Sequence, residues 1–198
     1  SAVYGEHGLS FFLQTPQGEI LFDTGQSGQA LAHNLGVLGL SLSSNCGVVL
    51  SHGHYDHTGG IPYLLDLPQR FRVIASRHIF DQKFSRLDDQ LRYVGIPLSR
   101  QLLDAAADLV LTEEPYEVVD KVYLTGRIPS SNDFETGDPR MVIKEAEKLI
   151  HDSMADDRAL LLDLGDSSVV ILGCCHAGLI NTLRYAVQTL KKPVRAVL

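Results

Sequence analysis

The sequence predicts a layered α/β fold with mixed sheets, and three features of the chain indicate this class. Pairs of short apolar runs joined by turn residues indicate β-hairpins near both ends of the chain. A compact apolar run, Cys46 to Ser51, is typical of a strand buried on both faces. A strand, a helix and another strand follow one another near the end, and this order is typical of a βαβ unit with parallel strands.

The first hairpin is expected where Leu9 to Leu13 and Glu19 to Phe22 flank the turn Pro16-Gln17-Gly18. It ends at Asp23-Thr24-Gly25, and we expect a polar, flexible loop to begin there. The buried strand comes next along the chain.

A histidine-rich loop follows the buried strand and leads into Gly59-Gly60, which permits a tight turn. Ile61-Pro62 begins a helix, because proline is tolerated in the first helical turn. Phe71 to Ala75 is expected to form another strand. Residues 77 to about 110 show helix-like periodicity and predict a helical insertion.

The middle of the chain is less regular. Glu117 to Leu124 has strand character. Residues 127 to about 150 mix proline, glycine, serine, asparagine and charged residues, so they predict a surface excursion that acts as a lid. A short helix is expected within it near Lys144 to Leu149.

The last part of the chain supplies the βαβ unit. Ala159 to Leu164 and Ser168 to Leu172 predict a hairpin. Apolar residues keep helical spacing from Leu179 until Lys191-Lys192-Pro193 ends the helix. The run Val194 to Leu198 begins a strand, and we expect the C-terminal part of the domain to be truncated there.

Composition argues against several classes of protein. At 198 residues the chain fits one domain, taken as residues 1–198. A formal net charge of −7, from 17 basic and 24 acidic residues, disfavours nucleic acid as a partner. No run approaches the roughly 20 apolar residues of a membrane span. Three cysteines, two of them adjacent, make a poor disulfide framework and favour the reducing cytoplasm.

The loop after the buried strand holds four ligand-type side chains within six positions, namely His52, His54, Asp56 and His57. Residues two apart at the end of a strand point the same way, so His52 and His54 suit one metal ion. Asp56 and His57 follow where the chain turns, which gives room for a second ion. Nitrogen and oxygen ligands suit zinc, with iron or manganese as alternatives. A histidine-rich surface loop is the alternative reading.

These residues, with Phe22-Asp23-Thr24-Gly25 upstream, resemble the metallo-β-lactamase superfamily. Four further motifs resemble its dihydropterin ribofuranosyl-aminobenzene phosphate synthase-like branch: Glu6-His7-Gly8-Leu9-Ser10, Leu124-Thr125-Gly126-x-Ile128-Pro129, Asp156-Asp157-x-Ala159-Leu160 and Gly173-Cys174-x-His176-Ala177-Gly178. The resemblance implies a four-layer αββα sandwich with metals in a groove at one edge of the two sheets. It also implies that His52 and His54 bind a first ion, and Asp56 and His57 a second.

Four other residues are candidates for the site. Asp23 is interpreted as a hydrogen-bond acceptor behind the ligands, the alternative being an ordinary turn aspartate. His176 stands between a strand and a helix N-terminus and is favoured as a ligand over a structural histidine. Cys174 stands where many relatives have a bridging aspartate, and it is either a zinc ligand or a small core residue. His7 either contacts the substrate or is a turn histidine.

The sequence also departs from the superfamily pattern. Thr125 to Pro129 lacks the histidine of the usual Gly-His motif, for which His176 is a substitute. The superfamily has a final Gly-Gly-Phe-His element after the last strand, and this chain ends at Leu198, just before that element. We therefore expect a second metal ion to lack one ligand.

We therefore expect a metal-dependent hydrolase that uses metal-activated water on a small ester or phosphoester substrate, with Asp56 as the catalytic residue. A pterin-precursor transferase is the main alternative. A non-catalytic, metal-dependent binding or sensor protein is the third.

Overall fold

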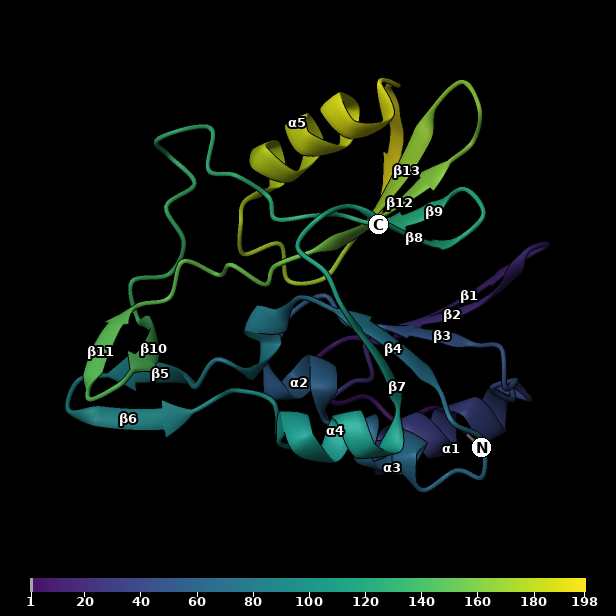
Figure 1. The fold of residues 1–198 in the computed structure, drawn as a ribbon, viewed down its shortest axis with the longest axis horizontal. Coiled ribbons are helices and arrows are strands. Elements are labelled where there is room, and N and C mark those ends of the chain that lie inside the picture. Colours follow the sequence, from purple (N-terminus) through teal and green to yellow (C-terminus); the bar gives the residue numbers. More distant parts are fainter. Residues whose placement is uncertain (1) are drawn as a thin grey trace.

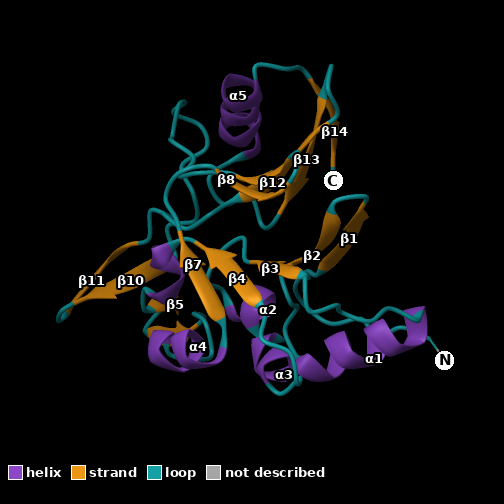
Figure 2. Ribbon diagram, turned by 45° about the vertical axis from the view of Figure 1, so that its right-hand side comes forward, coloured by secondary structure: helices purple, strands orange, loops and turns teal. Residues whose placement is uncertain are grey.

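The computed structural model describes residues 2–198 and contains two five-stranded sheets that face each other, with a smaller sheet to one side (Figure 1). Helices α1, α3 and α4 lie on the outer side of one large sheet, and α5 lies on the outer side of the other (Figures 1 and 2). Their bounds are α1 (Gly28–Leu38), α3 (Ile61–Leu65), α4 (Arg100–Ala106) and α5 (Leu179–Leu190). The predicted αββα layering of a mixed α/β fold is confirmed.

The first sheet has the order β1-β2-β3-β4-β7. Its strands are β1 (Phe11–Thr15), β2 (Gly18–Phe22), β3 (Gly47–Val49), β4 (Arg72–Ala75) and β7 (Asp108–Leu111). β1 and β2 form the predicted antiparallel hairpin, and β2, β3, β4 and β7 run parallel. Parallel strands end at the same edge, so the loops after β2 and β3 are neighbours.

The second sheet has the order β14-β13-β12-β9-β8. Its strands are β8 (Tyr116–Val119), β9 (Val122–Leu124), β12 (Ala159–Asp163), β13 (Ser168–Leu172) and β14 (Val194–Val197). β12 and β13 form the second predicted hairpin. β13 and β14 are parallel and are joined by α5, so the predicted βαβ unit is confirmed.

Apolar side chains from both large sheets fill the space between them. The first sheet contributes residues such as Ile20, Phe22 and Ile74, and the second contributes Leu160 and Ile171. Each of these side chains is at most 3% exposed. A second core lies between the first sheet and its helices, and a third lies beneath α5. The two sheets are therefore held as a sandwich with their strand ends fixed relative to each other.

The loop expected after Asp23-Thr24-Gly25 instead leads into helix α1. Ser27 caps its first turn by accepting a hydrogen bond from the Ala30 amide, and Gly39 ends it in the left-handed region at φ 65°. Leu31 and Leu35 are both 7% exposed, so the helix buries one face on the sheet. This i, i+4 pair between two capping residues is the sequence signal for α1.

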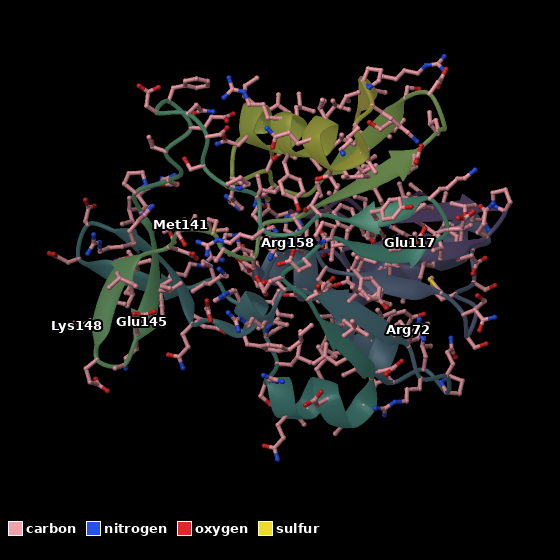
Figure 3. All side chains as sticks on the ribbon, turned by 45° about the horizontal axis from the view of Figure 1, so that its top comes forward. Arg72, Glu117, Met141, Glu145, Lys148 and Arg158 are labelled. Atoms are coloured by element: carbon pink, nitrogen blue, oxygen red, sulfur yellow. The ribbon has the colours of Figure 1, made fainter. Side chains whose placement is uncertain are left out.

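The prediction of a helical insertion at residues 77–110 is also wrong. The segment begins with the 3₁₀ turn η1 (Arg77–Phe80), continues as the hairpin β5 (Lys83–Leu87) and β6 (Gln90–Tyr93), and regains helical structure only in α4. β5 pairs with β10 (Met141–Glu145), which pairs with β11 (Lys148–His151). A third sheet, of order β11-β10-β5-β6, results. Figure 3 shows Glu145 and Lys148 at its end farthest from the sandwich, with Met141 nearer to it.

Two more expectations fail in the same way. The helix predicted near Lys144 to Leu149 is the β10–β11 hairpin, and the single strand predicted at Glu117 to Leu124 is the β8–β9 hairpin. The turns of the three hairpins place Asp88, Lys121 and Ala146 at φ values of 50°, 64° and 50°. Glycine is the residue that usually marks this left-handed region. Without a glycine, these turns carried no clear signal in the sequence.

The irregular segment 127–140 is attached to α5 rather than free of it. Asn181 accepts a hydrogen bond from the Ser131 amide at 2.9 Å, and Glu135 accepts from the amides of Ile180 and Asn181 at 2.8 and 2.9 Å. Its role as a lid stays a prediction. Within residues 2–198, none of the helices has the length and apolar character needed to cross a bilayer.

The core between the sheets should be sensitive to truncation at Leu160, which is fully buried. Leu160→Ala should lower the free energy of unfolding by about 2–5 kcal/mol, because the substitution leaves a cavity. Leu164→Ala is the matched control, since Leu164 is 50% exposed in the β12–β13 turn. Urea denaturation measures both. Equal effects of the two substitutions would contradict the assigned packing.

Candidate metal centre

The histidine loop begins at the carboxyl end of β3 and ends in the short helix α2 (Tyr55–Thr58). His52, His54, Asp56 and His57 are all buried, with exposed fractions between 0 and 8%. A second loop, residues 173–178, leaves the carboxyl end of β13 in the facing sheet. The sandwich therefore brings together two loops that are more than 100 residues apart in the sequence.

Three histidine rings meet at the junction of the loops. His52 Nε2 lies 3.0 Å from His54 Nδ1. The His176 ring is edge-on to both, with its centroid 4.9 Å from each of theirs. Ser51 Oγ lies 2.8 Å from His52 Nδ1, which fixes that ring and leaves Nε2 facing His54. The two histidines predicted for one ion thus present nitrogen atoms to each other.

The other predicted ligands lie against this cluster. His57 Nε2 is 3.0 Å from the sulfur of Cys174 and 3.7 Å from Asp56 Oδ2. Ligand atoms of His52, Cys174 and His176 all lie within 4.8 Å of one another. Cys174 is exposed and reaches the site with its sulfur, so the structure does not place it in the core.

Asp23 lies behind the loop, at the end of β2. One carboxylate oxygen accepts a hydrogen bond from the Ser51 amide at 2.7 Å. The other accepts from Ser51 Oγ and from His57 Nδ1, both at 2.6 Å. The Asp23 side chain is fully buried. It therefore orients the His57 ring so that Nε2 points at the centre.

Burial sets the charge of these histidines. It lowers the pKa of His52 well below the ordinary value and, together with the nearby His176, lowers the pKa of His54 to about 4. Burial also lowers the pKa of His176. At neutral pH these rings are uncharged, which is the form that binds metal.

His57 differs from the other three. Burial disfavours its charged form, but the acceptors Asp23 and Cys174 outweigh this and raise its pKa to about 10. Acceptors that favour a proton on this ring also favour a metal cation beside it.

His7 lies at the rim of the site. Its Nε2 atom is 3.4 Å from Asp56 Oδ2, and its side chain is 77% exposed. The ring is therefore accessible to a molecule that approaches the centre from solvent.

Sequence reasoning missed the importance of Asp156, which appeared only within a motif. Its carboxylate is fully buried and accepts a hydrogen bond from the Gly53 amide, between His52 and His54, at 2.7 Å. Its other oxygen binds the buried ammonium of Lys83. The adjacent acidic pair Asp156-Asp157 directly before an apolar strand was the available signal.

The residues present fit a divalent metal ion. The buried His176 Nε2 atom has no hydrogen-bond partner among residues 2–198. Buried imidazole nitrogens normally have one, and a metal ion can take that place. The donor set of imidazole, thiol and carboxylate is the one that zinc prefers.

Comparison with known proteins gives a consistent result. The sequence model of the Metallo-beta-lactamase superfamily matches residues 3–174. An uncharacterized protein of Methanocaldococcus jannaschii, MJ0448, is 31% identical over 92% of this chain and 68% of its own length. The 7,8-dihydropterin-6-methyl-4-(beta-D-ribofuranosyl)-aminobenzene-5'-phosphate synthase of the same organism is 24% identical over 95% of this chain and 67% of its own length.

Among solved structures, Tm1679, described as a metal-dependent hydrolase of the beta-lactamase superfamily, matches with a TM-score of 0.76 and 27% identity. The match covers 93% of this chain and 69% of that one. The chain thus spans about two thirds of the length of these similar proteins.

The three cysteines should differ sharply in reactivity. Burial raises the pKa of Cys46 to about 12, so at pH 8 roughly one Cys46 in ten thousand is the reactive thiolate. Iodoacetamide at pH 8 should label the exposed Cys174 first and Cys46 last, as followed by peptide mass spectrometry. Labelling of Cys46 should rise with pH, because the thiolate fraction increases towards the raised pKa. Rapid labelling of Cys46 in the folded protein would contradict its burial.

Proposed function

The chain belongs to the metallo-β-lactamase superfamily, and we propose that it is a metal-dependent hydrolase of ester or phosphoester bonds. The observation that carries the proposal is the 3.0 Å separation between His52 Nε2 and His54 Nδ1. Two nitrogen ligands of one tetrahedral zinc ion lie roughly 3.3 Å apart. The similarity to Tm1679, itself described as a metal-dependent hydrolase, supports the same class.

The proposed ligands form two sets of three: His52, His54 and His176 for one ion, and Asp56, His57 and Cys174 for a second. Zinc is the proposed metal, because nitrogen, sulfur and carboxylate donors all suit it. A bound divalent ion lowers the pKa of a coordinated water towards about 7 and polarises the bond to be cleaved.

Three side chains around the proposed metal centre have further roles in the proposed reaction. Asp23 holds His57 by its Nδ1 atom and keeps Nε2 turned inwards. The Asp56 carboxylate, whose Oδ2 lies 3.7 Å from His57 Nε2, is proposed to accept a hydrogen bond from the attacking water and so to orient it. His7, exposed beside Asp56, is proposed to contact the substrate.

A transferase of the pterin-precursor type is the second candidate, favoured by the 24% identity to the synthase over nearly the whole chain. Such an enzyme would release pyrophosphate only when an amine acceptor is present, whereas a hydrolase needs water alone. Assays of pyrophosphate release with and without an amine, beside a panel of phosphoesters and lactones, separate the two reactions. Metal binding without turnover of any substrate would favour a binding or sensor protein instead.

Asp56 tests the catalytic assignment. Asp56→Ala should lower turnover of a phosphoester or ester by roughly 10²- to 10⁴-fold, because the attacking water loses its orienting carboxylate. The thermal unfolding midpoint should change little. Asp120→Ala is the matched control, since Asp120 is an exposed aspartate in the β8–β9 turn. Full activity of the Asp56→Ala variant would contradict the assignment of Asp56 as the catalytic residue.

A further inference from the structure

A buried lysine connects the third sheet to the candidate metal centre. Lys83, at the start of β5, donates hydrogen bonds to Asp152 Oδ2 at 2.8 Å and to Asp156 Oδ1 at 2.9 Å. The three side chains are at most 3% exposed. None of them was expected from the sequence to act at the site.

The network reaches the metal loop through one backbone group. Asp156 uses its second oxygen to accept from the Gly53 amide at 2.7 Å, and Gly53 separates His52 from His54. On another side the loop lies against η1, where a Cβ atom added to Gly53 would come within 2.3 Å of the Ile79 carbonyl oxygen. Gly53 is thus held between the η1 backbone and the Asp156 carboxylate.

The same sheet contacts the loop on the other side of His54. The Tyr55 amide donates to the Val94 carbonyl at 3.0 Å, and the Val94 amide donates to the Lys83 carbonyl at 3.0 Å. Arg92 on β6 donates to the Tyr55 hydroxyl at 3.1 Å. The third sheet, which lies beside the sandwich in Figure 1, therefore fixes the residues on both sides of His54.

Stability alone does not account for this network. Two carboxylates and one ammonium bury three charges and leave one net negative charge in the interior. Apolar side chains of similar volume avoid that desolvation cost and often give a more stable protein. A fixed negative charge one residue away from two metal ligands is, however, favourable for a cation bound there.

We propose that Lys83 is a positioning residue of the metal centre: it holds Asp156 on the Gly53 amide and thereby fixes the His52 and His54 rings relative to each other. The inference rests on the proposed metal-dependent function. It assigns a role to the third sheet, because β5 begins at Lys83 and β11 ends one residue before Asp152.

The first test compares Lys83→Met with Lys192→Met. Lys192 pairs with Asp163 beyond α5 and has no contact with the loop, so it is a matched lysine–aspartate control. Lys83→Met should weaken Co²⁺ binding, measured by chelator competition, by about 10- to 100-fold and should change the Co²⁺ d–d absorption spectrum. The control should match the wild type in both. A folded Lys83→Met protein with affinity within twofold and an unchanged spectrum would overturn the proposal.

A second variant addresses the loss of the buried ion pair. Lys83→Met with Asp152→Asn keeps the net charge of the network at −1, and the asparagine oxygen still accepts from the Met154 amide as Asp152 does. This double variant should also bind Co²⁺ about 10- to 100-fold more weakly than the wild type and show a changed d–d spectrum. Affinity within twofold of the wild type and an unchanged spectrum would overturn the proposal.

A measurement on the wild type needs no variant. In the metal-free protein the Gly53 amide proton should exchange at least about 100-fold more slowly than an unprotected amide. Unprotected exchange would contradict the Asp156 contact. Failure of the wild type to bind Co²⁺ or Zn²⁺ would instead refute the proposed function. The exchange rate of the Gly53 amide would still decide whether Asp156 holds that amide.

Discussion

The arrangement of the whole site depends on the buried carboxylate of Asp23. This residue takes the left-handed conformation, at φ 60°, directly after β2, and its amide donates to the Val49 carbonyl of the neighbouring strand. Its two oxygens then receive three hydrogen bonds, two from Ser51 and one from His57. One side chain therefore ties together the ends of two parallel strands and both ends of the histidine loop. An unusual backbone conformation is retained because these contacts determine it.

The facing sheet can approach this carboxylate only because residue 173 has no side chain. A Cβ atom added to Gly173 would lie 2.4 Å from Ser51 Oγ. The close approach brings Cys174 and His176, from the end of β13, to the histidines that follow β3. The site is thus a product of the sandwich: neither sheet holds the complete set of donors, and the packing between the sheets decides whether the two loops meet.

Much of the fold could be predicted because strong local signals mark it. The two hairpins, the buried strand before His52 and the helix from Leu179 to Leu190 all carry clear periodicity or turn residues. The third sheet could not be predicted, since its turns use Asp88 and Ala146 where glycine is usual. Within the site, the histidine loop could be predicted because its four ligand-type residues lie within six positions of the sequence. The contacts of Asp156 with Gly53, and of Lys83 with Asp156, join positions 103 and 73 residues apart, and only the tertiary structure reveals them.

The proposed function requires the loops after β3 and β13 to form one metal centre. X-ray absorption of the zinc-loaded protein tests it most directly, because it reports the atoms bound to the metal. We predict a shell of imidazole nitrogens at about 2.0–2.1 Å and one sulfur at about 2.3 Å, with the sulfur lost in Cys174→Ser. Zinc that binds with oxygen ligands alone, or no zinc retained by the wild type, would contradict it.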